Sequence, residues 1–194
     1  MQAKDAIENP LSGERVTFPE EESVTSNDLL RFEWTIRPQG PLPDKVKQYP
    51  GHAHPISEER IRLVRGKIWF RSGGVETTML EGQEVIVPPR TPHSWWNVGD
   101  AEANAIVEFR PAGEMKSFFE TTFGLARDGE LGKGFRTMLR YAVICHDFKD
   151  EIKVLQRSER WGVFLFWPLG KLFGYSSRYS GKPTDPNVDK HRIQ

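Results

Sequence analysis

"GHAHPISEERIRLVRG", residues 51–66, places two histidines one residue apart in front of an alternating apolar run. Side chains at positions i and i+2 of a strand point to the same face, so His52 and His54 are expected to project together. Two imidazoles on one face suit a transition-metal ion. The same pair would also fit a surface loop, or a structural histidine with a hydrogen-bond partner, so the pair alone leaves the metal undecided.

Two adjacent glutamates follow the histidines, and on an extended strand they face opposite ways. Glu59 alternates in step with Ile61 and Leu63, whose apolar side chains are expected to fill an interior. Glu58 alternates with arginines, which need solvent. The pattern therefore predicts that the Glu59 carboxylate is buried. A buried carboxylate needs a counter-charge, and a divalent cation held by neutral imidazoles is an effective one.

Strand periodicity extends over about residues 29–111. Apolar side chains at positions 30, 32, 34 and 36 alternate with polar ones at 31, 33, 35 and 37. Glycine-containing turns separate further runs of strand composition, namely RIRLVRG (60–66), KIWFRSGG (67–74), EVIVPP (84–89), HSWWNV (93–98) and NAIVEFRP (104–111). Many short strands at this spacing predict a closed antiparallel barrel or a jelly roll.

A second stretch, GQEVIVPPRTPHSWWN (residues 82–97), carries another histidine. Together the two stretches resemble the paired motifs of the cupin superfamily, in order and in the gap between them. The matching positions are His52, His54, Glu59 and Gly66 in the first motif, and Gly82, Pro88, His93 and Asn97 in the second. Glu59 fits better than Glu58, because only Glu59 leaves six residues before Gly66.

Two positions depart from the family pattern. Val46 stands where the first motif begins with glycine, and Arg90 stands at a glycine of the second motif. The arginine leaves the predicted ligand His93 intact and puts only the turn before it in doubt.

The resemblance implies a mainly β fold, a cupin jelly-roll β-barrel (double-stranded β-helix), with appended C-terminal α-helices. It also implies one metal ion held by four side chains, His52, His54, Glu59 and His93. Such a ligand set leaves open positions on an octahedral ion. It suits one divalent first-row transition metal, whether iron, manganese, nickel, cobalt or zinc.

The neighbours of the predicted site indicate an aromatic and apolar pocket. Trp95 and Asn97 share strand parity with His93, and Trp34 is expected on another wall, although each could equally belong to the core. Such a lining suits a planar or hydrophobic substrate better than a free sugar or a phosphate ester.

The leading hypothesis is a metal-dependent dioxygenase resembling the quercetin-cleaving cupins, acting on an aromatic or hydrophobic enol or diketone. In this hypothesis Glu59 is both a metal ligand and the catalytic residue that moves a proton. The alternatives are a metal-dependent isomerase, cyclase or decarboxylase, and a non-enzymatic cupin that binds a small molecule.

The character of the chain changes after Pro111. Apolar residues at helical intervals in 113–152 predict two helices joined by DGELGKG (128–134). A third apolar stretch, WGVFLFWPLGKLFGY (161–175), is too short to span a bilayer. We expect it to pack on the barrel or on a second subunit, in preference to a membrane surface. The last stretch, 179–194, is expected to be a loose tail.

Length and charge limit the partners. The 194 residues suit one core with an appendage, so the predicted division is a cupin barrel with its N-terminal strands (1–112, motif-bearing core 29–111) and a helical extension with tail (113–194). Lysine plus arginine and aspartate plus glutamate number 27 each, which argues against nucleic acid as a partner. The single cysteine and the polar N-terminus favour a cytoplasmic protein. A small-molecule substrate and a homodimer are expected.

Overall fold

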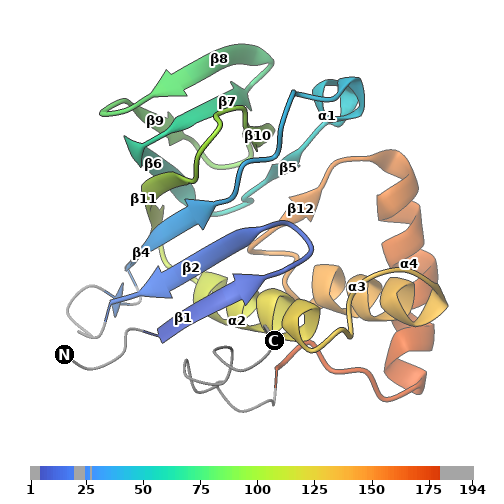
Figure 1. Cartoon of the computed structure of the whole chain (residues 1–194). Coiled ribbons are helices and arrows are strands. Elements are labelled where there is room, and N and C mark those ends of the chain that lie inside the picture. Colours follow the sequence, from blue (N-terminus) through green and yellow to red (C-terminus); the bar gives the residue numbers. More distant parts are fainter. Residues whose placement is uncertain (1–4, 20–24, 27, 180–194) are drawn as a thin grey trace, which may run out of the picture.

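The structure is a computed structural model that describes residues 5–19, 25–26 and 28–179. Two antiparallel sheets form its larger part (Figure 1). The strands are β1 (Asp5–Asn9), β2 (Glu14–Phe18), β3 (Thr25–Ser26), β4 (Leu29–Ile36), β5 (His52–Ala53), β6 (Glu58–Arg65), β7 (Lys67–Ser72), β8 (Val75–Leu80), β9 (Glu84–Val87), β10 (His93–Asn97), β11 (Ala103–Arg110) and β12 (Lys153–Val154).

One sheet has seven strands in the order β1-β2-β4-β11-β6-β9, with β3 paired to β4, and the other has five in the order β12-β5-β10-β7-β8. Some neighbours in the sheets, such as β4 and β11 or β5 and β10, are distant in sequence, as in a jelly roll, and the predicted mainly β cupin fold is confirmed. The sequence predicts a loose tail over residues 179–194. Of this stretch the structure describes Tyr179, and residues 180–194 lie outside the described residues.

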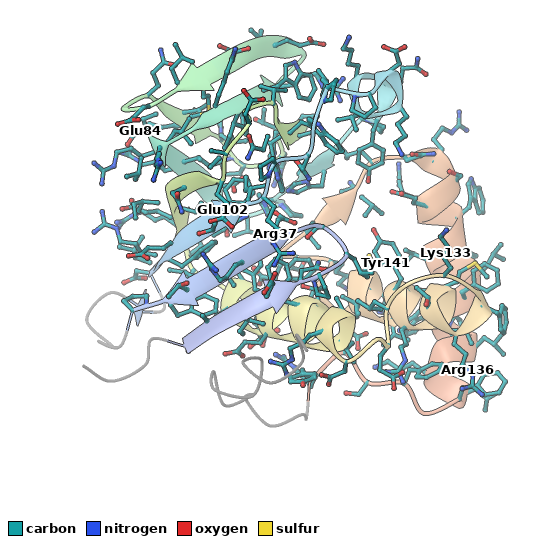
Figure 2. All side chains as sticks on the ribbon, viewed as in Figure 1. Arg37, Glu84, Glu102, Lys133, Arg136 and Tyr141 are labelled. Atoms are coloured by element: carbon teal, nitrogen blue, oxygen red, sulfur yellow. The ribbon has the colours of Figure 1, made fainter. Side chains whose placement is uncertain are left out.

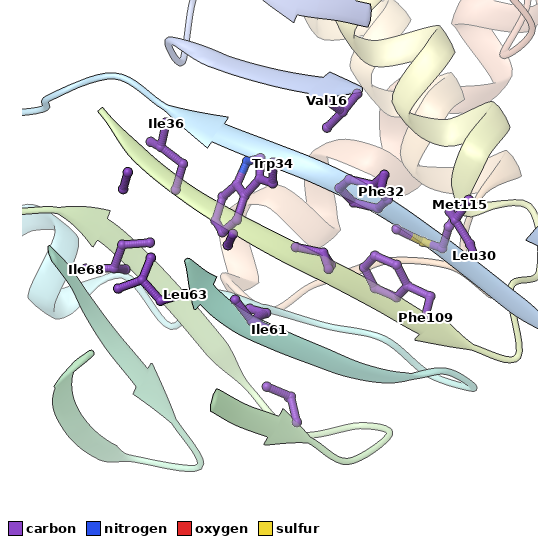
Figure 3. Close-up of a cluster of buried hydrophobic side chains, with 14 of the residues drawn as sticks. Val16, Leu30, Phe32, Trp34, Ile36, Ile61, Leu63, Ile68, Phe109 and Met115 are labelled. Atoms are coloured by element: carbon purple, nitrogen blue, oxygen red, sulfur yellow. The ribbon is translucent and has the colours of Figure 1, made fainter. Parts of the chain in front are cut away.

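Apolar side chains of both sheets meet in one core (Figure 3). The even positions of β4 that carry Leu30, Phe32 and Trp34 are buried, as their alternation predicts. Strand β6 follows the predicted parity, because Ile61 and Leu63 are buried beside Glu59, which is 5% exposed. The strand pattern does not predict β8, because five of its six side chains are exposed and show no alternation.

Four helices accompany the sheets: α1 (Asp44–Gln48), α2 (Met115–Arg127), α3 (Phe135–Asp147) and α4 (Arg157–Leu172). Figure 1 shows α2, α3 and α4 gathered on one side, with α1 apart from them near β5. The helices expected beyond Pro111 are confirmed, and residues 128–134 join α2 to α3 as predicted. Among the described residues, no helix is both long and apolar enough to cross a membrane.

The third apolar stretch, expected on the barrel or on a second subunit, forms α4 and packs on α3. Its contact with a second subunit stays a prediction. Trp167 stacks on His146 of α3, with ring centroids 3.7 Å apart. A Cβ at Gly170 would come within 2.6 Å of Val143 Cγ2, so only glycine permits this close approach of the two helices. Pro168 lies inside α4 without ending it.

Candidate metal centre

Three histidines from two paired strands of the five-stranded sheet converge inside the barrel. Strand β5 pairs with β10 so that His52 lies opposite His93, and His54 follows directly after β5. One ring nitrogen from each of the three imidazoles lies within 4.8 Å of the others. His54 and His93 are 4% and 0% exposed. Nitrogen atoms this close together can all bind one small cation.

Glu59 reaches this cluster from β6, in the opposite sheet. Its Oε2 lies 2.9 Å from His93 Nε2 and 3.5 Å from His54 Nε2. The strand parity that selects Glu59 over Glu58 is therefore confirmed by burial and by position. The structure brings together all four residues that the sequence predicts as ligands, and whether they bind an ion stays a prediction.

Backbone carbonyls orient two of the imidazoles. Nδ1 of His54 lies 2.7 Å from the carbonyl oxygen of Glu151, and Nδ1 of His93 lies 3.0 Å from that of Thr91. A carbonyl oxygen only accepts, so each Nδ1 carries the proton and donates it. Nε2 of a neutral ring is then a lone-pair acceptor directed at the cluster. Metal-binding histidines are generally oriented in this way.

The atoms that face one another in the cluster lack hydrogen-bond partners. Among the described residues, His54 Nε2, His93 Nε2 and Glu59 Oε2 are buried and unpartnered, since the close approach of Glu59 to His93 lacks hydrogen-bond geometry. Three converging acceptors repel one another, and each is costly to leave unsatisfied. A cation would satisfy all three at once, so the residues present fit a metal ion.

The electrostatics of the cluster favour the protonation state that a cation needs. Burial by itself would raise the pKa of Glu59, but the neighbouring His93 and His54 hold that pKa well below its usual range. Burial, together with His93 and His54, lowers the pKa of His52. Burial opposes the charged form of His93 too, but the Glu59 carboxylate raises its pKa. A proton and a cation therefore compete for His93.

Two backbone positions hold the histidine-bearing segments together. Gly51 has φ +80°, and a Cβ there would lie 2.0 Å from the carbonyl oxygen of His93. The turn before His93 is kept although glycine is missing from it, because Arg90 adopts φ 66° and donates its backbone N–H to the carbonyl of His54 at 2.7 Å. The turn therefore forms with arginine in the left-handed conformation that glycine adopts most easily.

The C-terminal segment also takes part in the site. Besides the Glu151 carbonyl, it contributes β12, whose Val154 lies opposite His52 and whose Lys153 lies opposite Ala53. The Glu151 carboxylate accepts the backbone N–H of Glu114 at 2.9 Å, which anchors the loop that carries the carbonyl. Sequence reasoning missed Gly51 and Glu151. Gly51 was visible as a glycine beside the histidines, but nothing in the sequence marks a carbonyl.

A pocket of about 810 Å³ opens beside His52. Its walls come from the α1 segment, from β10 and from the start of α4, and its lining includes Tyr49, Trp95, Trp96 and Glu159. Tyr49 donates its hydroxyl to the Glu159 carboxylate at 3.1 Å, which joins two of these walls. Arg71 of β7 donates to the backbone carbonyls of Lys47 and Tyr49 and so fastens the α1 wall to the barrel.

The three predicted pocket residues have different positions. Trp95 lines the pocket, with its ring 5.1 Å from that of His52. Trp34 stands behind it in an edge-to-face contact at 5.0 Å and donates Nε1 to Glu14. Asn97 is fully buried, and its amide bonds to the backbone of Ile36, Ala101 and Gly99. Trp34 and Asn97 are not among the residues that line this pocket, and both side chains make contacts within the fold.

The family comparison agrees with the fold and the two motifs. Residues 43–109 match the family model described as a cupin domain. These residues therefore form a cupin domain. A comparison with curated proteins finds none that matches.

Many solved structures are similar in fold. An RmlC-like cupin from Shewanella frigidimarina NCIMB 400 is 18% identical, with 57% of this chain and 86% of that one covered at a TM-score of 0.42. KdgF from Halomonas sp. is 13% identical, with 54% and 84% covered at 0.41. The DMSP lyase DddQ from Ruegeria pomeroyi DSS-3 is 27% identical, with 44% and 39% covered at 0.36.

Proposed function

We propose that this cupin is an enzyme that uses one divalent first-row transition metal ion to act on a small organic molecule. His52, His54, His93 and Glu59 would hold the ion. The observation that carries the proposal is the set of three buried, unpartnered acceptors, because they converge from two sheets on a space that a cation would complete. An ion bound there would supply Lewis-acid and, if redox-active, electron-transfer chemistry.

The chain's own residues indicate how a substrate would be held. The indole of Trp95 and the rings of Tyr49 and Trp96 offer aromatic walls to a planar molecule. His52 lies at the inner side of the same pocket, so the reactive part of the molecule would face the cluster. Glu59 would accept a proton from an enol or hydroxyl group at its carboxylate oxygen, which lies beside His93 and His54.

Within this class we propose a dioxygenase resembling the quercetin-cleaving cupins, with an aromatic or hydrophobic enol or diketone as substrate. Such a reaction incorporates both atoms of dioxygen into the organic molecule, so one dioxygen disappears for each substrate consumed. Support comes from the aromatic pocket beside three imidazoles and one carboxylate.

The test begins with metal analysis of protein purified without a histidine tag, then stripped by chelation and reloaded with single metals. Flavonols, diketones and catechols are then screened in an oxygen electrode with product analysis. Equal consumption of dioxygen and substrate supports the dioxygenase. Turnover with unchanged dioxygen would place the protein among the isomerases, cyclases or decarboxylases, and tight binding without turnover among the binding cupins.

The double variant His52→Ala/His54→Ala separates the metal from the fold. It should lose stoichiometric metal while its far-UV circular dichroism stays unchanged, because the apolar strand pattern does not include these residues. His146→Ala on α3 is the control, since this imidazole stacks on Trp167 away from the cluster. Full metal retention by the double variant under chelation would refute the assigned ligands.

A cytoplasmic homodimer remains part of the proposal. The sheets end in the edge strands β1, β9, β8 and β12, and pairing of such an edge with a second copy would cover its unpaired backbone groups. Light scattering at micromolar concentration should give twice the mass of one chain, and the mass of a single chain would refute the dimer.

A further inference from the structure

The outer face of α4 carries an unusual run of exposed apolar side chains. Trp161 is 62% exposed, Phe164 70% and Leu165 60%, and Leu172 at the end of the helix is 82% exposed. Phe164 and Leu165 follow Trp161 by three and four residues, and Leu172 follows Leu165 by seven, so the four lie on one stripe of the helix. Figure 1 shows α4 at the outer edge of the molecule, beyond α3. The opposite stripe, with Trp167 and Gly170, packs on α3.

Basic side chains border this stripe. Arg157 and Arg160 are exposed, and with Trp161 and Phe164 they line a surface hollow of about 450 Å³. Lys133 and Arg136, labelled beside α3 and α4 in Figure 2, are also exposed. Within the described residues, the ion pairs of the molecule include none of these four cations.

Charge decides which partner this surface fits. A two-fold contact between copies would bring the four cations of one surface toward the same four of the other, and like charges repel. An anionic lipid bilayer complements both features, because its phosphates attract the cations and its acyl region accepts the aromatic and leucine side chains. Trp and Phe beside Arg are typical of helices that lie in a membrane interface.

We infer that α4 is an interfacial docking helix that binds the protein to the surface of anionic membranes. The helix lies on the bilayer and does not cross it, and the docking does not depend on the proposed metal. Gln156 and Glu159, at the start of the same segment, line the pocket beside His52. These two residues lie on the face of α4 opposite to Trp161 and Phe164, so docking through the apolar stripe leaves the pocket uncovered.

The experiment is co-sedimentation of the full chain with vesicles of phosphatidylglycerol and phosphatidylcholine in equal parts, and with vesicles of phosphatidylcholine alone. We expect binding to the anionic vesicles that weakens with added salt. Arg157→Gln/Arg160→Gln should lower the partition coefficient by about twenty-five-fold, since each of the two basic residues near such a surface contributes about a factor of five. Trp161→Ser/Phe164→Ser should lower it by about a hundredfold.

Matched controls lie on the barrel. Arg62→Gln/Arg65→Gln removes the same charge from exposed positions of β6, and Val75→Ser alters a side chain of β8 that is 72% exposed. Both should bind like the unaltered protein. Equal loss in the controls, or no binding to anionic vesicles, would overturn the proposal. A dimer that dissociates in Trp161→Ser/Phe164→Ser, without vesicle binding, would overturn it in favour of a second copy.

Discussion

The barrel strands and the C-terminal segment both reach the imidazole cluster, but they contribute different kinds of group. The barrel provides side chains, namely the three imidazoles and the Glu59 carboxylate. The C-terminal segment provides backbone, namely the Glu151 carbonyl and the edge strand β12. The residue type at a position reveals the chemistry of its side chain, whereas a backbone carbonyl is present at every residue and so marks none of them. The contribution of the barrel was therefore predictable, and that of the C-terminal segment was not.

The largest expected effect is on the free energy of unfolding, and it concerns the backbone of the barrel. Gly51→Ala should lower the free energy of unfolding by about 3 kcal/mol, because the added Cβ would collide with the carbonyl of His93 at 2.0 Å. Gly82→Ala is the matched control, since Gly82 has φ +84° but nothing within 4 Å. It should cost only about 1 kcal/mol of backbone strain. Urea unfolding measures the stability of both variants. Equal losses would contradict the close contact between Gly51 and the carbonyl of His93.

The next effect tests the side chains of the barrel. Glu59→Gln should weaken metal binding by about a hundredfold, because an amide does not balance the charge of the ion, and a direct ligand matters at least as much as its outer partners. Glu58→Gln is the control on the same strand, with its side chain on the other face. Competition with a metal-sensitive dye measures both affinities. A larger loss for Glu58→Gln would contradict the register of β6.

The contribution of the C-terminal segment can be tested through the anchor of its loop. Glu151→Ala removes the acceptor of the Glu114 N–H and should let the carbonyl that orients His54 move. Metal affinity should fall by about tenfold, as it does when an outer hydrogen bond to a ligand is lost. Asp150→Ala, at an exposed neighbouring position, should leave the affinity unchanged. The same dye competition applies, and identical affinities would show that the barrel orients His54 unaided.

The smallest effect concerns the turn that departs from the family pattern. Arg90→Gly should raise the free energy of unfolding by about 1 kcal/mol, because an L residue at φ 66° pays a steric penalty that glycine avoids. Part of this gain is cancelled by the greater freedom of glycine in the unfolded chain. Glu81→Gly, at a turn residue that does not itself have a positive φ, should instead lower stability. A lower melting temperature for Arg90→Gly would contradict the strained turn.

The sequence by itself determined what depends on short spacing. Alternation of apolar residues identified the buried faces of β4 and β6, and the same parity selected Glu59 over Glu58. The two motifs identified the cupin barrel, and helical spacing located the helices beyond Pro111. Each of these features follows from how neighbouring residues are oriented along one element.

Only the tertiary structure decided which distant groups meet. The carbonyl of Glu151 approaches His54 across 97 residues of sequence separation, and α4 packs on α3 through Gly170, a contact that the sequence did not predict. Asn97, which looks like a pocket residue by parity, uses its amide for backbone hydrogen bonds within the fold. Backbone groups and close approaches carry no periodic signal, because they depend on the path of the whole chain and not on the residue types along one strand or helix.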